Sequence, residues 1–123
     1  MLFLDADDVI RIARRTIGPD VQIRDAGLIE AAIARPRATV GGKYAYPSLT
    51  EMAAALTHSL VTNHAFVDGN KRVGLACLLV FLRLNDRRLT WTNDEAHDVI
   101  YRIADGSLRD VNEIARSIDR GIH

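Results

Sequence analysis

Residues 64–84 read HAFVDGNKRVGLACLLVFLRL, a polar stretch that runs directly into an apolar one. The second part, residues 73–84, is apolar almost throughout, so a helix formed there has no polar face to turn toward water. A helix that is hydrophobic on all sides is buried inside a protein, and this run is too short to cross a bilayer. We therefore predict one buried central helix at 70–85 with a polar loop at its N-terminus.

The first turn of that predicted helix carries two cations, Lys71 and Arg72. The N-terminus of a helix is the positive end of its dipole, so acidic residues are the usual choice there. Free backbone N–H groups at the same end already favour an anion. One interpretation makes both cations solvated surface residues and Asp68 an ordinary N-cap. The set as a whole favours an anion-binding site built on a rigid helix, because local rules are broken at functional sites.

Three residues of the loop carry separate kinds of chemistry. The imidazole of His64 can accept a proton from a hydroxyl nucleophile. Asp68 supplies the hard oxygen ligand that Mg²⁺ prefers. Gly69 allows a ligand to approach the backbone closely and helps to form an anion-binding nest. Together they predict a base, a metal carboxylate and a phosphate cradle in one loop.

The residues that follow complete a polyphosphate site. Asn70 can fix the loop or donate to phosphate, and Lys71 and Arg72 can neutralise a polyphosphate. Such a set suits transfer from a nucleoside triphosphate to a hydroxyl, because this reaction depends mostly on positioning and charge stabilisation. The loop is not a Walker loop, since the earlier glycine and the Ser/Thr after the lysine are missing.

The whole chain has 123 residues, 48% of them hydrophobic, and sixteen basic residues balance sixteen acidic ones. This length predicts a single domain, residues 1–123. The absence of a basic excess argues against direct nucleic-acid binding. No signal peptide and no transmembrane stretch is apparent, so we expect a cytoplasmic protein without membrane contact. Cys77 lies in the apolar run and is predicted to be a small buried hydrophobe.

The sequence around the loop predicts an all-α fold, a compact bundle of six helices around the central one. Apolar residues recur at helical spacing in every flanking segment, and a capping residue precedes each of them. The expected flanking helices and their caps are 5–17 (Asp5), 26–35 (Asp25), 49–63 (Ser48 or Thr50), 93–105 (Thr92 with Glu95) and 108–120 (Ser107).

Residues 37–48 are expected to form a loop before the motif, with a possible short hairpin that turns at Gly41 and Gly42. Lys43, Tyr44 and Tyr46 provide functional groups on it. Exposed loops with such side chains contact partners in some proteins and are only connections in others. Both interpretations stay open on the residues alone.

The stretch HAFVDGNKR resembles the signature of the Fic/Doc superfamily, H-x-F-x-[D/E]-[G/A]-N-[G/K]-R, and matches most closely the Doc branch, the death-on-curing toxins of toxin–antitoxin pairs. Residues 28–36, LIEAAIARP, also resemble the Doc pattern. Ala65 stands where many relatives have proline, a departure that should not affect the chemistry. The resemblance covers nearly the whole chain and implies a Fic/Doc-like helical bundle.

Two departures separate this chain from the AMP-transferring Fic pattern. That pattern has glycine at the position of Lys71 and a second arginine at the position of Leu75. The resemblance implies that Doc proteins bind ATP in reverse and transfer its γ-phosphate, with Mg²⁺, to a protein of the elongation factor Tu class, which stops translation. It also implies a cognate Phd-like antitoxin that covers an apolar groove.

Carried over residue by residue, the resemblance implies these roles. His64 is the general base, Asp68 the Mg²⁺ ligand, and Arg72 a further catalytic residue. Lys43, Tyr44 and Tyr46 would belong to a flap that aligns the target chain. The nucleotide phosphates would be held by Gly69, Asn70, Lys71 and Arg72.

Two alternatives remain beside the kinase. The first is a Fic-type protein adenylyltransferase, which moves AMP from ATP to a protein hydroxyl; Lys71 and Leu75 speak against it. The second is a non-catalytic binding module that keeps the fold; an intact His64 and Asp68 speak against that one.

Overall fold

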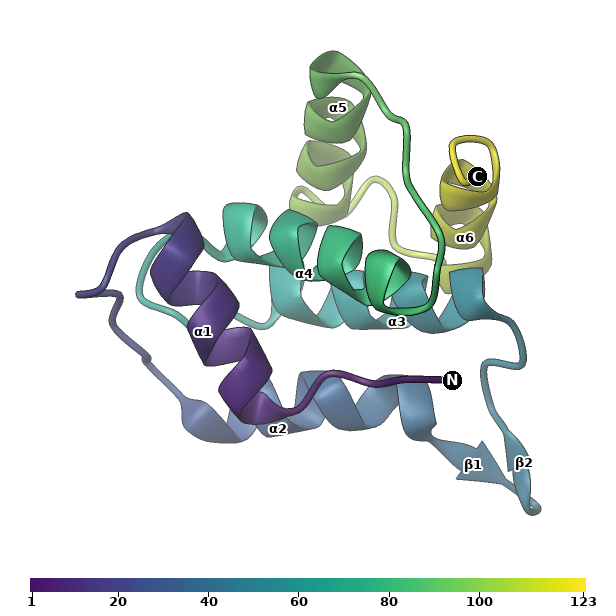
Figure 1. Cartoon of the computed structure of the whole chain (residues 1–123), viewed down its shortest axis with the longest axis horizontal. Coiled ribbons are helices and arrows are strands. Elements are labelled where there is room, and N and C mark those ends of the chain that lie inside the picture. The colour runs from purple at the N-terminus through teal and green to yellow at the C-terminus, as the bar shows by residue number, and fades with distance from the viewer.

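The computed structural model describes residues 1–123 and confirms an all-α bundle with one very small hairpin (Figure 1). No helix is both long enough and apolar enough to span a membrane. A 3-10 turn, η1 (Arg35–Arg37), follows the second helix, and the hairpin strands are β1 (Thr39–Val40) and β2 (Lys43–Tyr44). The six helices are α1 (Ala6–Thr16), α2 (Ala26–Ala34), α3 (Leu49–Thr62), α4 (Asn70–Leu84), α5 (Asn93–Ala104) and α6 (Val111–Asp119).

Most of the predicted helix starts are confirmed by capping contacts. The side chain of Asp5 accepts from the backbone N–H of Asp8, and the side chain of Asp8 accepts from that of Asp5, so the two form a capping box. Thr92 and Glu95 form the same reciprocal pair at the start of α5. Each box satisfies two N–H groups that a helix leaves without partners. The caps predicted for α2 and α3 are also present, at Asp25 and Ser48.

The predicted start of the last helix is wrong. Its N-cap is Asp110, whose side chain accepts from the N–H of Asn112, and the helix begins at Val111. The hydroxyl of Ser107 instead donates to the backbone oxygen of Arg102 at 3.3 Å. Two capping residues therefore stand three positions apart, and the second one begins the helix.

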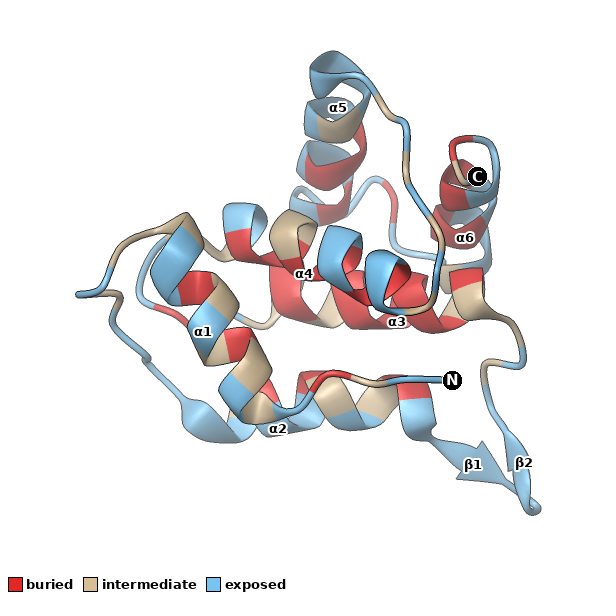
Figure 2. Ribbon diagram, in the orientation of Figure 1, coloured by how far each residue is buried: buried red, intermediate tan, exposed pale blue.

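The prediction that residues 70–85 form the one buried central helix is wrong, because α3 takes that place. In α3, nine of fourteen residues are buried, whereas α4 keeps its outer face on the surface, with Leu79, Val80 and Leu84 each 39% exposed. Figure 2 shows α3 as almost continuously buried and α4 as buried on one side only. The reason lies in side-chain size: residues 53–55 of α3 are alanines, which let other helices approach on every side.

Close packing between α3 and α4 fixes the frame of the site. Gly74 lies against Val61, and a Cβ on Gly74 would come within 2.5 Å of a Val61 methyl group. Burial raises the pKa of the Cys77 thiol to about 12, and the charge of Asp8 adds to this, so the predicted inert cysteine is confirmed as buried. The polar loop 64–69 joins the end of α3 to the start of α4.

Candidate functional site

The loop between α3 and α4 opens into a cavity of about 390 Å³. Val61 from α3 and Ala104 from α5 complete its wall. The structure thus brings together all of the residues that the sequence assigned to catalysis and phosphate binding: His64, Asp68, Gly69, Asn70, Lys71 and Arg72.

His64 has a backbone conformation that few non-glycine residues adopt. Its φ is 56°, in the left-handed region. Arg24 holds this strained backbone: its Nε donates to the carbonyl of His64 at 2.7 Å and its Nη2 to that of Asn63 at 3.3 Å. The amide of Asn63 in turn donates to the carbonyl of Leu28. Strain that the surroundings enforce in this way is typical of functional sites.

Asn70 closes the loop on itself. Its amide donates to the carbonyl of Phe66 at 2.9 Å and accepts from the N–H of Phe66 at 3.1 Å. Phe66 is 1% exposed and fixes the loop to the core. The loop-fixing role of Asn70 is therefore confirmed, and its role as a phosphate donor stays a prediction.

Gly69, not Asp68, is the N-cap of α4. Its φ is 83°, and it makes no side-chain capping bond. A Cβ at this position would overlap the side chain of Ile17, the residue that follows α1, so the packing opposes a larger residue and the backbone conformation favours glycine. The Oδ1 of Asp68 accepts from the N–H of Gly69 at 2.8 Å, and its Oδ2 has no partner. Asp68 therefore keeps one oxygen for a ligand.

The two cations at the start of α4 have no acidic partner. The chain contains two ion pairs, and neither involves Lys71 or Arg72. The first backbone bond of the helix runs from the N–H of Val73 to the carbonyl of Gly69, so the N–H groups before Val73 stay free. Unpaired cations, free N–H groups and the positive end of a helix dipole meet in this cavity.

This donor set fits magnesium only together with phosphate. No group of three His, Cys, Asp or Glu side chains lies close enough to hold a metal ion alone. Mg²⁺ commonly binds through one or two carboxylates, with phosphate oxygens and water completing its octahedron. The free oxygen of Asp68, beside a cationic phosphate pocket, matches that pattern.

The segment after α1 is a second wall of the site, which the sequence reasoning missed. The N–H of Val67 donates to the carbonyl of Gln22 at 3.0 Å, and Ile23 pairs with Phe66 as an antiparallel bridge. In the sequence, Gly18-Pro19 indicated only a helix end, and the extended stretch after it is too short to show alternation. The residue in this segment that contacts the motif through its side chain is Arg24, which bonds the carbonyls of Asn63 and His64.

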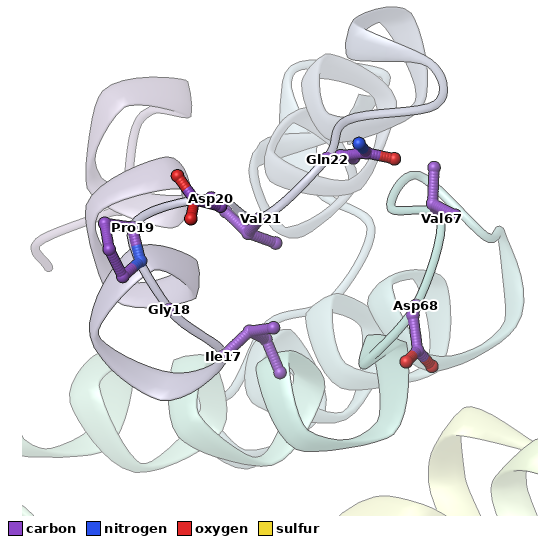
Figure 3. A pocket seen from close by; sticks show the side chains of 8 residues that line it. All are labelled: Ile17, Gly18, Pro19, Asp20, Val21, Gln22, Val67 and Asp68. Carbon is purple, nitrogen blue, oxygen red and sulfur yellow. The ribbon is translucent and has the colours of Figure 1, made fainter.

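A separate cavity of about 360 Å³ lies between residues 17–22 and the motif loop. Figure 3 shows the side chains of Ile17 and Val21 on one side and those of Val67 and Asp68 facing them across it. Asp68 also lines the phosphate cavity. Its carboxylate therefore stands on the border between the two cavities.

The hairpin predicted as a flap lies at the other end of α3 from the motif loop. The hairpin precedes α3, whereas the motif loop follows it, and a fourteen-residue helix separates them by about 21 Å. None of Lys43, Tyr44 and Tyr46 lines the cavity around His64. The role of these residues in aligning a target stays a prediction; α3 lies between them and the motif loop (Figure 1).

A third cavity, about 460 Å³, lies between α4 and α5 and shares Lys71 and Arg72 with the phosphate cavity. The Nζ of Lys71 stands 5.2 Å from the ring centroid of Tyr101 on α5. The rings of His97 and Tyr101 stack at 4.2 Å. The lysine side chain thus lies where the two cavities adjoin.

Comparison with known proteins gives two matches. The model of the Fic/DOC family matches residues 3–82, which include the motif loop and most of α4. A protein named Toxin Doc, from Mycolicibacterium smegmatis (strain ATCC 700084 / mc(2)155), is 44% identical over 104 residues, which cover 83% of this chain and 80% of the relative.

Proposed function

Because this chain belongs to the Fic/DOC family, we propose that it is a Doc-type toxin that acts as a protein kinase. It transfers the γ-phosphate of ATP to a hydroxyl of a translation factor of the elongation factor Tu class and so inhibits translation. One observation carries the proposal: a base, a half-free carboxylate and two unpaired cations line a single cavity at a helix N-terminus. A cognate Phd-like antitoxin is the expected partner.

The proposed chemistry assigns one task to each side chain. His64 accepts the proton of the target hydroxyl, whose oxygen then bonds to the γ-phosphorus while the bond to ADP breaks. Asp68 would hold Mg²⁺, which offsets phosphate charge when it is bound. Arg72 and the free N–H groups of the first turn stabilise the charge that develops on the transferred group. The left-handed backbone of His64 keeps the imidazole at the cavity.

The position of Lys71 supports transfer of the terminal phosphate. A nucleotide that places its inner phosphate at the loop and its nucleoside between α4 and α5 has to displace Lys71 from Tyr101. A nucleotide that enters with its terminal phosphate leaves this contact intact. The cavity between α4 and α5 is nevertheless large enough to hold part of a ligand, so adenylyl transfer is the second candidate.

The segment 18–25 is a further proposed docking site for the target, beside the flap that the resemblance implies. Its cavity adjoins the phosphate cavity at Asp68 (Figure 3). A polypeptide that lies there brings its hydroxyl to the border where the carboxylate and the base meet the phosphate. The contacts of Arg24 and Gln22 hold this wall in register with the motif.

The test incubates the purified protein with elongation factor Tu, Mg²⁺ and either γ-labelled or α-labelled ATP. We expect label to reach the factor only from γ-labelled ATP, and His64→Ala to abolish the transfer because the base is gone. His123→Ala, at an exposed position far from the motif in sequence, serves as the matched control and should keep full activity. Label from α-labelled ATP would show the adenylyltransferase instead, and no label from either would reject both.

A further inference from the structure

The imidazole of His64 has no side chain that orients it. Its ring makes no hydrogen bond to another residue, whereas the ring of His58 bonds Arg35. Where a histidine acts as a base, a third group commonly bonds the second ring nitrogen and fixes the direction of the imidazole. In this chain the direction of the ring has to come from the backbone of His64.

The backbone of His64 stays in its conformation only because the surroundings hold it there. Its φ of 56° lies in the left-handed region, which few residues with a Cβ occupy without support. Asn63, directly before it, still has a right-handed conformation with φ of −88° at the end of α3. The chain therefore changes hand within one step, and a relaxed His64 would direct its side chain elsewhere.

Three consecutive carbonyl groups around His64 accept hydrogen bonds from one short segment. The side chain of Arg24 donates from Nη2 to the carbonyl of Asn63 at 3.3 Å and from Nε to that of His64 at 2.7 Å. The backbone N–H groups of Arg24 and Asp25 both donate to the carbonyl of Ala65, at 2.8 and 3.0 Å. The peptide planes on both sides of His64 are thus held, and Arg24 takes part in all three contacts.

The guanidinium of Arg24 is used for these contacts and for no other. Its planar fork has N–H groups in fixed directions, which suits two neighbouring carbonyls, and bonds from a charged donor are stronger than neutral ones. Arg24 forms no ion pair. It lines neither the phosphate cavity nor the cavity beside residues 17–22. Its side chain therefore acts on the loop and not on a ligand.

Asn63 supports the same arrangement from α3. Its Oδ1 accepts from the N–H of Ala65 at 3.1 Å, and its amide donates to the carbonyl of Leu28 at 2.9 Å. Leu28 lies on α2, the helix that follows Arg24 in the chain. The stretch that carries the base is thus tied to two helices, and Arg24 is the tie that bonds His64 itself.

We propose that Arg24 is the positioning residue of the base: its two side-chain bonds hold His64 in the left-handed conformation that directs the imidazole into the phosphate cavity. This inference rests on the proposed function, in which His64 accepts the proton of the target hydroxyl. Because Arg24 touches neither nucleotide nor hydroxyl, its loss slows the transfer and leaves the affinity for ATP unchanged. Lys71, Arg72 and the free N–H groups of α4 keep their places without it.

The first experiment measures transfer from γ-labelled ATP to elongation factor Tu. We expect Arg24→Ala to lower kcat roughly ten- to hundredfold, since a displacement of about 1 Å can cost about a hundredfold in rate, while KM for ATP stays the same. Arg24→Lys keeps the charge but loses the fork, so it should also fall below the wild type. Guanidinium ion at low concentration should restore part of the activity of Arg24→Ala and none of that of His64→Ala.

The second experiment does not depend on catalysis. Nuclear magnetic resonance of the chain with isotope-labelled histidine gives the Cα chemical shift of His64, which reports its backbone conformation. The chain has four histidines, and His64→Ala identifies the signal. We expect this signal to move in Arg24→Ala. The matched control is Arg88→Ala, at an exposed position whose side chain makes no hydrogen bond, and it should change neither the signal nor kcat.

The proposal is overturned if the His64 signal is the same in Arg24→Ala as in the wild type, if kcat does not fall, or if KM for ATP rises instead. An equal loss of kcat in Arg88→Ala would also overturn it. If the wild type transfers no label, the proposed function fails, and the chemical shift still decides whether Arg24 positions His64. If Arg24→Ala does not fold, as judged by circular dichroism, Arg24→Lys provides both readouts in its place.

Discussion

At the scale of one residue, Asn70 stabilises the motif loop through its own hydrogen bonds, whether or not a ligand is bound. Among the motif residues, it is the one whose side chain bonds the backbone in both directions. The sequence left its two roles open, because an amide both donates and accepts and nothing in the spacing tells a loop brace from a phosphate donor. The two bonds between Asn70 and the backbone of Phe66 show that Asn70 fixes the loop.

Replacement of Asn70 therefore tests the brace. Asn70→Ala leaves a buried N–H and C=O of Phe66 without partners, so we expect the free energy of unfolding to fall by about 1–3 kcal/mol. Asn112→Ala, on the exposed side of α6, is the control and should change it little. Urea denaturation followed by circular dichroism measures both. Equal stability of Asn70→Ala and wild type would mean that the brace contributes nothing.

Six of the predicted site residues line one cavity because they all lie within the nine residues 64–72, so the motif alone brings them together. The second wall, residues 18–25, comes from a distant part of the chain and has no periodic pattern. Apart from the side-chain bonds of Arg24, its contacts with the motif loop are backbone bonds, such as that from the N–H of Val67 to the carbonyl of Gln22, which no side-chain type indicates. Sequence reasoning finds local sets of residues far more easily than walls assembled by the fold.

At the scale of elements, the predictions that are wrong concern places where the sequence offers two candidates for the same role. Ser107 and Asp110 both have the chemistry of an N-cap, and the first one was chosen for the last helix. Likewise, the apolar run of α4 indicated burial on all sides, while α3, with its alanines, takes the centre. Propensity and periodicity locate helices well, but the packing of neighbours decides which one lies inside.

The last helix provides a direct comparison of the two caps. Asp110→Ala removes the acceptor for the N–H of Asn112, so we expect a loss of about 0.5–2 kcal/mol in the free energy of unfolding. Ser107→Ala removes only an exposed hydroxyl bond to Arg102 and should cost much less. Chemical denaturation of the two single variants gives both values. A larger loss of unfolding free energy for Ser107→Ala than for Asp110→Ala would mean that Ser107, and not Asp110, caps the helix.

At the scale of the whole molecule, the contact between Nη1 of Arg35 and Nδ1 of His58, 2.9 Å long, makes stability depend on pH. Burial, and then the positive charge of Arg35, lower the pKa of His58. The unfolded chain therefore binds a proton at a pH where the folded chain does not. Stability is full above the unfolded pKa, near 6.5, and falls as the pH decreases from there to the lowered folded pKa.

His58→Gln should remove this part of the pH dependence. We expect the free energy of unfolding of the wild type to decrease between about pH 6.5 and pH 5, and that of His58→Gln to decrease less over the same range. Urea denaturation at closely spaced pH values measures the two curves, and their difference isolates His58 from the other titrating groups. Parallel curves would show that the imidazole is not held in the neutral form.

The length of α3 decides whether the molecule can bind two partners at the same time. Sites more than about 10 Å apart that share no contact act additively, and the length of α3 keeps the hairpin of β1 and β2 about 21 Å from the motif loop. A protein bound at the hairpin end of α3 therefore does not block the cavity at the motif loop. Tethering and catalysis can thus be combined in a single assembly, and evolution can alter one without retuning the other.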